Sequence, residues 1–118
     1  MKKISSKQGQ INKKIRRAYK EIALERGHYC SGCGRADGDV SLSHSHLIPR
    51  SRRADLSFDK ANITYHCLSM GERKGCHEIW ESINKDKLLD YHKNLEYILE
   101  MDIEYYFIIT ELNAKAPR

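Results

Sequence analysis

Four cysteines suggest chemistry most directly, because they occur as two pairs, Cys30-x2-Cys33 and Cys67-x8-Cys76. In a reducing compartment disulfides are disfavoured, and two clustered pairs are typical of a zinc site. Four thiolates fill a tetrahedral site and leave no open position, so we expect this metal to stabilise the fold rather than to catalyse a reaction. The alternative is four unrelated buried thiols.

The two pairs differ in how strongly they indicate metal binding. In the first, the segment "CSGCGR" has small residues between the ligands and Gly34 after them, as a tight turn requires. In the second, eight residues separate the ligands, and the charged segment "LSMGERKG" between them indicates an inserted loop. His77 follows Cys76 directly and is an alternative fourth ligand. Because two adjacent residues such as Cys76 and His77 are poorly placed to bind the same ion, we assign Cys76 to zinc and leave His77 for a second ion.

A second group of reactive residues lies in "SHSHLIPRS", residues 43–51, where His44 and His46 are two apart. Histidine is the side chain that most readily accepts a proton near neutral pH. Arginines follow closely, and a guanidinium suits a bidentate grip on phosphate. We therefore expect phosphate contacts from this loop, the alternative being an ordinary solvated loop. Its arginines are Arg50, Arg52 and Arg53.

The elements that position these residues follow from hydrophobic spacing. Apolar residues at helical intervals predict a helix over residues 9–26 that stops at Gly27, with a basic opposite face. That face carries Lys13, Lys14, Arg16, Arg17 and Lys20. Alternation predicts strands in residues 40–48 and 61–67, which can pair as a hairpin. One or two helices are expected over residues 85–113, where the apolar "YYFII" should pack on the first helix rather than on a second copy.

Composition and charge limit the class of protein. A chain of 118 residues with 40% hydrophobic and 31% charged residues is expected to form a single domain. It has no apolar run long enough for a membrane span and no apolar segment after its basic start, so we expect a cytoplasmic protein. The net charge is +5, and residues 1–26 carry nine Lys or Arg against two Glu. This asymmetry favours a polyanionic partner, although a solvated helix face is the plainer explanation.

Between about Cys30 and Trp80 the sequence resembles the HNH endonucleases, which have a ββα-metal fold. The resemblance is carried by "CSGC", by "SHLIPRS", by the Asn of "ANIT", by the Cys of "YHC" and by "GCH". It implies an α+β fold, with a small zinc-stabilised ββα-metal core over residues 28–83. The basic helix (9–26) and the C-terminal helical segment (84–113) lie outside the resemblance, within one predicted domain of residues 1–118.

The resemblance also implies roles for three residues. His46 corresponds to the general base that activates water against the phosphodiester. Asn62 corresponds to the Asn that tethers the loop of the hairpin and helps to orient the base. His77 corresponds to the final histidine of the motif, a ligand to a divalent cation (Mg²⁺, Mn²⁺, Ni²⁺ or Zn²⁺). Cleavage in this family leaves 5′-phosphate and 3′-hydroxyl ends.

One position departs from the family pattern. The family usually has Asp or His directly before the base, as a second ligand of the catalytic cation, and here that position holds Ser45. Either a bulge or bend lets His44 reach the ion, or His77, water and phosphates hold the ion alone. A third possibility is a decayed site that only binds. We expect His44 to be a ligand.

The resulting prediction is a DNA endonuclease acting on double-stranded DNA, a monomer or homodimer without membrane contact, of the kind that phages and mobile elements encode. The first alternative is a non-catalytic, zinc-stabilised DNA-binding module, which needs only the cysteine site. The second is a protein-interaction scaffold that uses the apolar C-terminal helix. An enzyme requires His46 and His77 to converge, which separates it from both alternatives.

Overall fold

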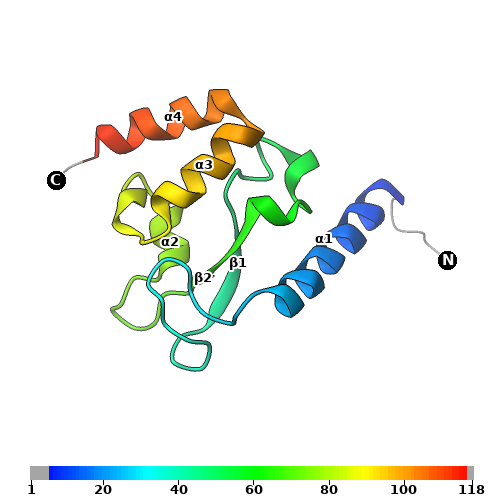
Figure 1. Ribbon diagram of the computed structural model, residues 1–118, viewed down its shortest axis with the longest axis horizontal. Coiled ribbons are helices and arrows are strands. Elements are labelled where there is room, and N and C mark those ends of the chain that lie inside the picture. The colour runs from blue at the N-terminus through cyan, green and yellow to red at the C-terminus, as the bar shows by residue number, and fades with distance from the viewer. Residues whose placement is uncertain (1–5, 117–118) are drawn as a thin grey trace.

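A two-stranded antiparallel hairpin lies between helices on both of its faces (Figure 1). The computed structural model describes residues 6–116, and the ends of the predicted domain, residues 1–5 and 117–118, lie outside the described residues. The elements in chain order are α1 (Ser6–Glu25), β1 (Leu42–His46), β2 (Ile63–Cys67), α2 (Cys76–Trp80), α3 (Tyr91–Met101) and α4 (Ile103–Ala114). Short 3-10 turns occur at Ala54–Leu56, Lys60–Asn62 and Lys85–Lys87. The fold is α+β, and both strands are shorter than the segments predicted for them.

The register of the hairpin decides which side chains share a face. Leu42 pairs with Cys67 and His46 pairs with Ile63, with no interruption of the ladder between them. Because side chains alternate along a strand, His44 and His46 lie on one face and Ser45 lies on the other. A bulge that would turn His44 towards the face of Ser45 is absent from this ladder.

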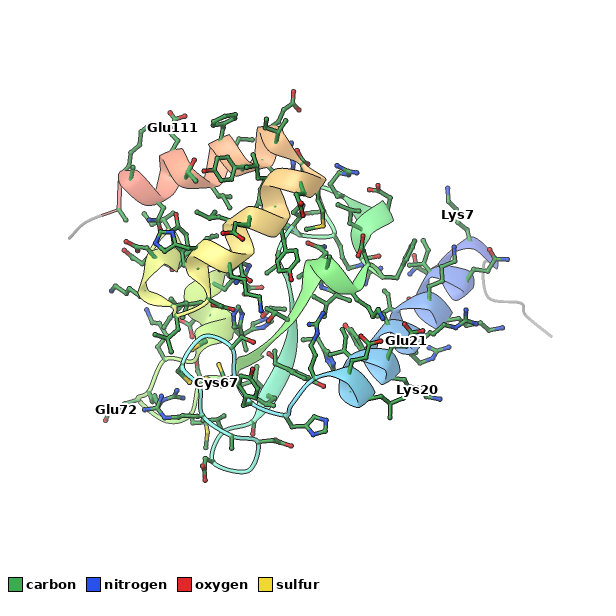
Figure 2. All side chains as sticks on the ribbon, viewed as in Figure 1. Lys7, Lys20, Glu21, Cys67, Glu72 and Glu111 are labelled. Carbon is green, nitrogen blue, oxygen red and sulfur yellow. The ribbon has the colours of Figure 1, made fainter. Side chains whose placement is uncertain are left out.

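Helix α1 covers the face that carries His44. Its buried Ala18 and Ile22 pack with Ile63 and Tyr65 of β2. The apolar stripe predicted from the sequence therefore meets the hairpin, and the helix starts three residues earlier than expected. The basic residues of its outer face are exposed, namely Lys13, Lys14, Arg16, Arg17 and Lys20. Figure 2 shows Lys7 and Lys20 extending from this helix away from the rest of the chain.

Helices α2, α3 and α4 build the larger core on the opposite face, around Trp80, Ile98 and Ile109. Helices α3 and α4 are separate because Asp102 ends the first and caps the second, its carboxylate accepting a hydrogen bond from the Tyr105 N–H (3.0 Å). The expectation that "YYFII" packs on the first helix was wrong. Helix α4 packs on α3, and α1 lies on the other side of the hairpin (Figure 1).

Within residues 6–116, none of the helices combines the length and the apolar character needed to cross a membrane.

Candidate metal centre and histidine pocket

The four cysteines converge. Their Sγ atoms all lie within 4.8 Å of one another, and those of Cys33 and Cys67 are 3.9 Å apart. Cys30, Cys67 and Cys76 are buried and Cys33 is partly buried. Among the described residues no other three His, Cys, Asp or Glu side chains gather in this way. All four predicted zinc ligands are thus brought together, and Cys76 rather than His77 completes the set.

Local backbone geometry explains why these cysteines meet. Cys30 and Cys33 flank a turn that Gly34 closes, with φ +82° and its N–H donating to the Cys30 carbonyl (2.7 Å). Cys67 is the last residue of β2, and Cys76 is the first residue of α2. Gly32 is required for close approach, because a Cβ there would lie 2.8 Å from the Cβ of Cys76.

The surroundings lower the pKa of Cys33 and Cys67, whereas burial raises the pKa of Cys30 and Cys76. The N–H groups of Cys67 and Cys76 point at the Sγ atoms of Cys30 (3.3 Å) and Cys67 (3.4 Å). The Arg73 guanidinium lies 3.4 Å from Cys67 Sγ and 3.6 Å from Cys33 Sγ. Burial opposes ionisation of Cys33, but hydrogen bonds from Arg35 and its neighbours lower its pKa to about 6. Four soft donors at this separation, with compensating positive groups, are compatible with a structural zinc site.

A second site lies at the other end of β1, in a pocket of about 460 Å³. Its polar lining includes His44, His46, Arg50, His77, Glu81 and Lys85. The pocket lies where the hairpin, α2 and the loop after β1 meet.

Asn62 holds the loop that follows His46. Its Oδ1 accepts from the Ile48 N–H (2.7 Å), and its Nδ2 donates to the carbonyls of Ile48 (3.1 Å) and Leu56 (3.2 Å). The side chain is fully buried. These three bonds tie the loop between the strands to the start of β2.

His46 has a defined tautomer. Its Nε2 lies 2.8 Å from the Ser57 carbonyl, which can only accept, so Nε2 carries the hydrogen and Nδ1 of the neutral ring carries a lone pair. Burial lowers the pKa of His46, and the positive charge of Arg50 lowers it further, against the effect of the hydrogen bond to the Ser57 carbonyl. A neutral imidazole with a free lone pair is the form that a general base needs.

His77 reaches the pocket from α2. Its Nδ1 lies 3.0 Å from Ser43 Oγ and 2.9 Å from Ser45 Oγ, and its Nε2 lies 3.5 Å from Glu81 Oε2. His44 instead stacks on Tyr19, with ring centroids 3.7 Å apart. His44 and His77 both line the pocket, but among the described residues no hydrogen bond or ring contact joins them, and the role of His44 as a ligand stays a prediction.

The three loop arginines have different surroundings. Arg52 donates to both carboxylate oxygens of Asp102 (3.0 and 3.3 Å), and Arg53 does the same to Asp55 (2.9 and 2.8 Å). Arg50 lines the pocket and, among the described residues, has no side-chain hydrogen bond or ion pair. Arg53 also lies 3.4 Å from Asp102 Oδ2, so two of the three predicted phosphate ligands hold the loop to the residue between α3 and α4.

The sequence did not indicate three further residues of the site, namely Ser43, His66 and Asp90. His66 is fully buried, with Nδ1 3.0 Å from Ser45 Oγ and Nε2 2.9 Å from Asp90 Oδ2. Ser43 also contacts His77. The strand alternation that places Ser43, Ser45 and His66 on one face was available in the sequence, whereas nothing marked Asp90.

Comparison of the chain with protein-family models, curated proteins and solved structures finds no match.

Proposed function

We propose that the protein is a metal-dependent endonuclease that hydrolyses phosphodiester bonds of double-stranded DNA, with the arrangement of an HNH enzyme. One observation carries the proposal. His46, with its tautomer fixed by the Ser57 carbonyl, lines an open pocket together with His77 and Arg50. A base, a potential cation ligand and an unpaired guanidinium in one pocket are the parts that phosphodiester hydrolysis requires.

In this proposal the cysteine cluster binds zinc and has no part in the reaction. A full set of four thiolates leaves no position for water or substrate. Its contribution is to fix the turn at Cys30–Cys33 against the end of β2 and the start of α2. It thereby holds His77, the neighbour of Cys76, in place.

The general base is His46. Nδ1 takes a proton from the attacking water, and the Ser57 carbonyl, which accepts from Nε2–H, stabilises the positive charge that then forms on the ring. The lowered pKa keeps the ring neutral at physiological pH. Arg50 binds a phosphate oxygen beside the scissile bond. The expected ends are a 5′-phosphate and a 3′-hydroxyl.

A divalent cation would be held by His77 Nε2 and Glu81, which lie 3.5 Å apart. Two donors are few, but Mg²⁺ and Mn²⁺ characteristically keep several positions for water and phosphate, so the residues fit an open site of this kind. The chemistry supplied there when the cation is bound is neutralisation of the phosphate and leaving-group oxygens.

The DNA duplex would extend from the pocket along the basic outer face of α1. No side-chain ion pair within the described chain occupies its Lys13, Arg16 or Arg17, and Lys14 makes only a cation–π contact with Phe58. These side chains are therefore available for backbone phosphates, in contacts that weaken as salt is added.

The decisive experiment is a supercoiled-plasmid cleavage assay with Mg²⁺, Mn²⁺, Ni²⁺ or Zn²⁺, comparing the parent with His46→Ala. We expect the substitution to slow cleavage by about 10²- to 10⁴-fold, the usual contribution of a general base. DNA binding and zinc content should be unchanged, which is the control for folding. A variant that cuts as fast as the parent would refute the assignment of His46.

A second candidate function is a zinc-stabilised DNA-binding module without catalysis. The observation in its favour is Ser45, which occupies the usual position of a cation ligand and instead hydrogen bonds to His77. The same assay separates the two functions, since a binding module retards DNA in a gel but leaves the plasmid uncut with every cation.

A further inference from the structure

Four side chains form a continuous line of hydrogen bonds, namely Asp90, His66, Ser45 and His77. Asp90 Oδ2 lies 2.9 Å from His66 Nε2, His66 Nδ1 lies 3.0 Å from Ser45 Oγ, and Ser45 Oγ lies 2.9 Å from His77 Nδ1. The first three residues are at most 8% exposed. The line thus runs from the buried interior to the pocket, where His77 Nε2 is its open end.

The direction of every hydrogen in this line follows from Asp90. Burial would raise the pKa of that carboxyl, but its hydrogen bond with His66 outweighs burial and the pKa lies below its ordinary value. A carboxylate can only accept, so His66 Nε2 carries a hydrogen. When the His66 ring is neutral, as in alkaline solution, its Nδ1 accepts from the Ser45 hydroxyl. Because that hydroxyl has one hydrogen, Ser45 Oγ can only accept from His77 Nδ1–H.

Ser43 leads to the same tautomer independently. Its hydroxyl donates to the His66 carbonyl (2.7 Å), so its oxygen can only accept from His77 Nδ1, 3.0 Å away. Two serine oxygens therefore both require a hydrogen on Nδ1 of His77. In a neutral ring the lone pair then belongs to Nε2.

We infer that Ser43, Ser45, His66 and Asp90 are positioning residues that hold His77 as the Nδ1–H tautomer, with the lone pair of Nε2 presented to the pocket. Ligating histidines commonly donate their other N–H to an oxygen acceptor, which fixes the ring and its tautomer. Ser45 thus orients His77, although it stands at the position where the family has a second cation ligand. The consequence for cation binding and cleavage rests on the proposed function, whereas the tautomer does not.

The test is long-range ¹H–¹⁵N NMR of the zinc-loaded protein in alkaline buffer, where imidazoles are neutral, since the two ring nitrogens have distinct shifts in each tautomer. We expect His77 to show hydrogen on Nδ1 and His66 to show hydrogen on Nε2. A His77 with hydrogen on Nε2 in the parent protein overturns the inference, and this measurement needs no variant.

Variants of the serines test whether Ser43 and Ser45 fix the tautomer of His77. We expect Ser43→Ala combined with Ser45→Ala to abolish the preference of His77 for Nδ1–H, and Ser45→Thr, which keeps the hydroxyl, to preserve it. The matched control is Thr64→Val, because Thr64 is the cross-strand partner of Ser45 and, within residues 6–116, its hydroxyl donates to Ser31 Oγ (3.1 Å) and not to His77. A double variant that keeps the tautomer, or a control that loses it, contradicts the inference.

Manganese binding separates this inference from the proposed function. Mn²⁺ titration followed by electron paramagnetic resonance should show about 10- to 100-fold weaker binding in the double serine variant, as for other residues that orient a ligand. If the parent has the expected tautomer but neither binds Mn²⁺ nor cuts DNA, the proposed function fails and the inference stands. If the double variant loses the tautomer yet binds Mn²⁺ as tightly as the parent, the positioning role is refuted.

Discussion

The cysteine cluster and the histidine pocket are built on the same hairpin and meet at adjacent residues of α2, Cys76 and His77. The cluster gathers four donors of one kind within 4.8 Å, and three of them are buried. The pocket is open, and its two central imidazoles are each held by a hydrogen bond of one ring nitrogen to oxygen. The first turn of α2 thus contributes Cys76 to the closed cysteine cluster and His77 to the open pocket.

In the proposed function this difference separates a zinc ion that is needed for folding from a pocket cation that is not. Four sulfurs within 4.8 Å of one another repel as thiolates, so we expect their arrangement to depend on a cation that offsets their charge. His46 and His77 are oriented by the Ser57 carbonyl and by two serine oxygens, all of which belong to the chain. We therefore expect the pocket to keep its geometry when divalent cations are removed, and the cluster to lose its geometry when zinc is removed.

The largest effect should come from breaking the cluster. Cys33→Ser removes one thiolate from a complete set, and because structural zinc binding supplies folding free energy, we expect the variant to lose its bound zinc and its cooperative thermal transition. Metal content and a circular-dichroism melt measure both. Chelation of zinc from the parent should reproduce the result, whereas chelation of the cation in the pocket should leave the melt unchanged.

The matched control is Ser31→Ala, in the same turn but outside the donor set. It should retain zinc and melt close to the parent. A Cys33→Ser protein that melts like the parent would show that the cysteines are ordinary buried thiols and that the two regions do not differ in this way.

Local patterns predicted the cluster and the hairpin well. The turn at Cys30–Cys33 and the alternation on both strands are encoded by neighbouring residues, and the alternation already placed Ser45 opposite to His44. The positions of Cys67 and Cys76, at the end of β2 and the start of α2, also follow once the two strands are paired.

Contacts between distant residues could not be predicted in the same way. Asp90 is 24 residues from His66, and Asp102 is 50 residues from Arg52. Whether a buried carboxylate finds an imidazole, or an exposed arginine finds an intramolecular partner, depends on how α3 and α4 pack on the hairpin. Arg52 and Arg53 were predicted as phosphate ligands, and their charge in the sequence could not show that Asp102 and Asp55 are their partners in the fold.

Breaking the pocket without touching the cluster should have an intermediate effect. Asn62→Ala deletes three hydrogen bonds and leaves the Ile48 N–H buried without an acceptor, so we expect a loss of about 2 to 4 kcal/mol in the free energy of unfolding. Urea denaturation measures the loss, and zinc content should not change. An Asn62→Ala protein that releases zinc would show that the two regions are not separable.

The smallest effect should come from Arg50, and it tests what the open pocket is for. Arg50→Ala removes a guanidinium that has no partner within the described chain, so we expect unchanged stability, weaker DNA binding and a salt dependence of binding reduced by about one phosphate contact. Arg52→Ala is the matched control, because its guanidinium already binds Asp102 and its loss should lower stability with little change in the salt dependence. Fluorescence anisotropy of a labelled duplex across a salt series distinguishes the two variants. Equal salt slopes for Arg50→Ala and the parent would mean that the pocket does not bind phosphate. The cysteine cluster could then still be a structural metal site, but the pocket would not be a site for DNA.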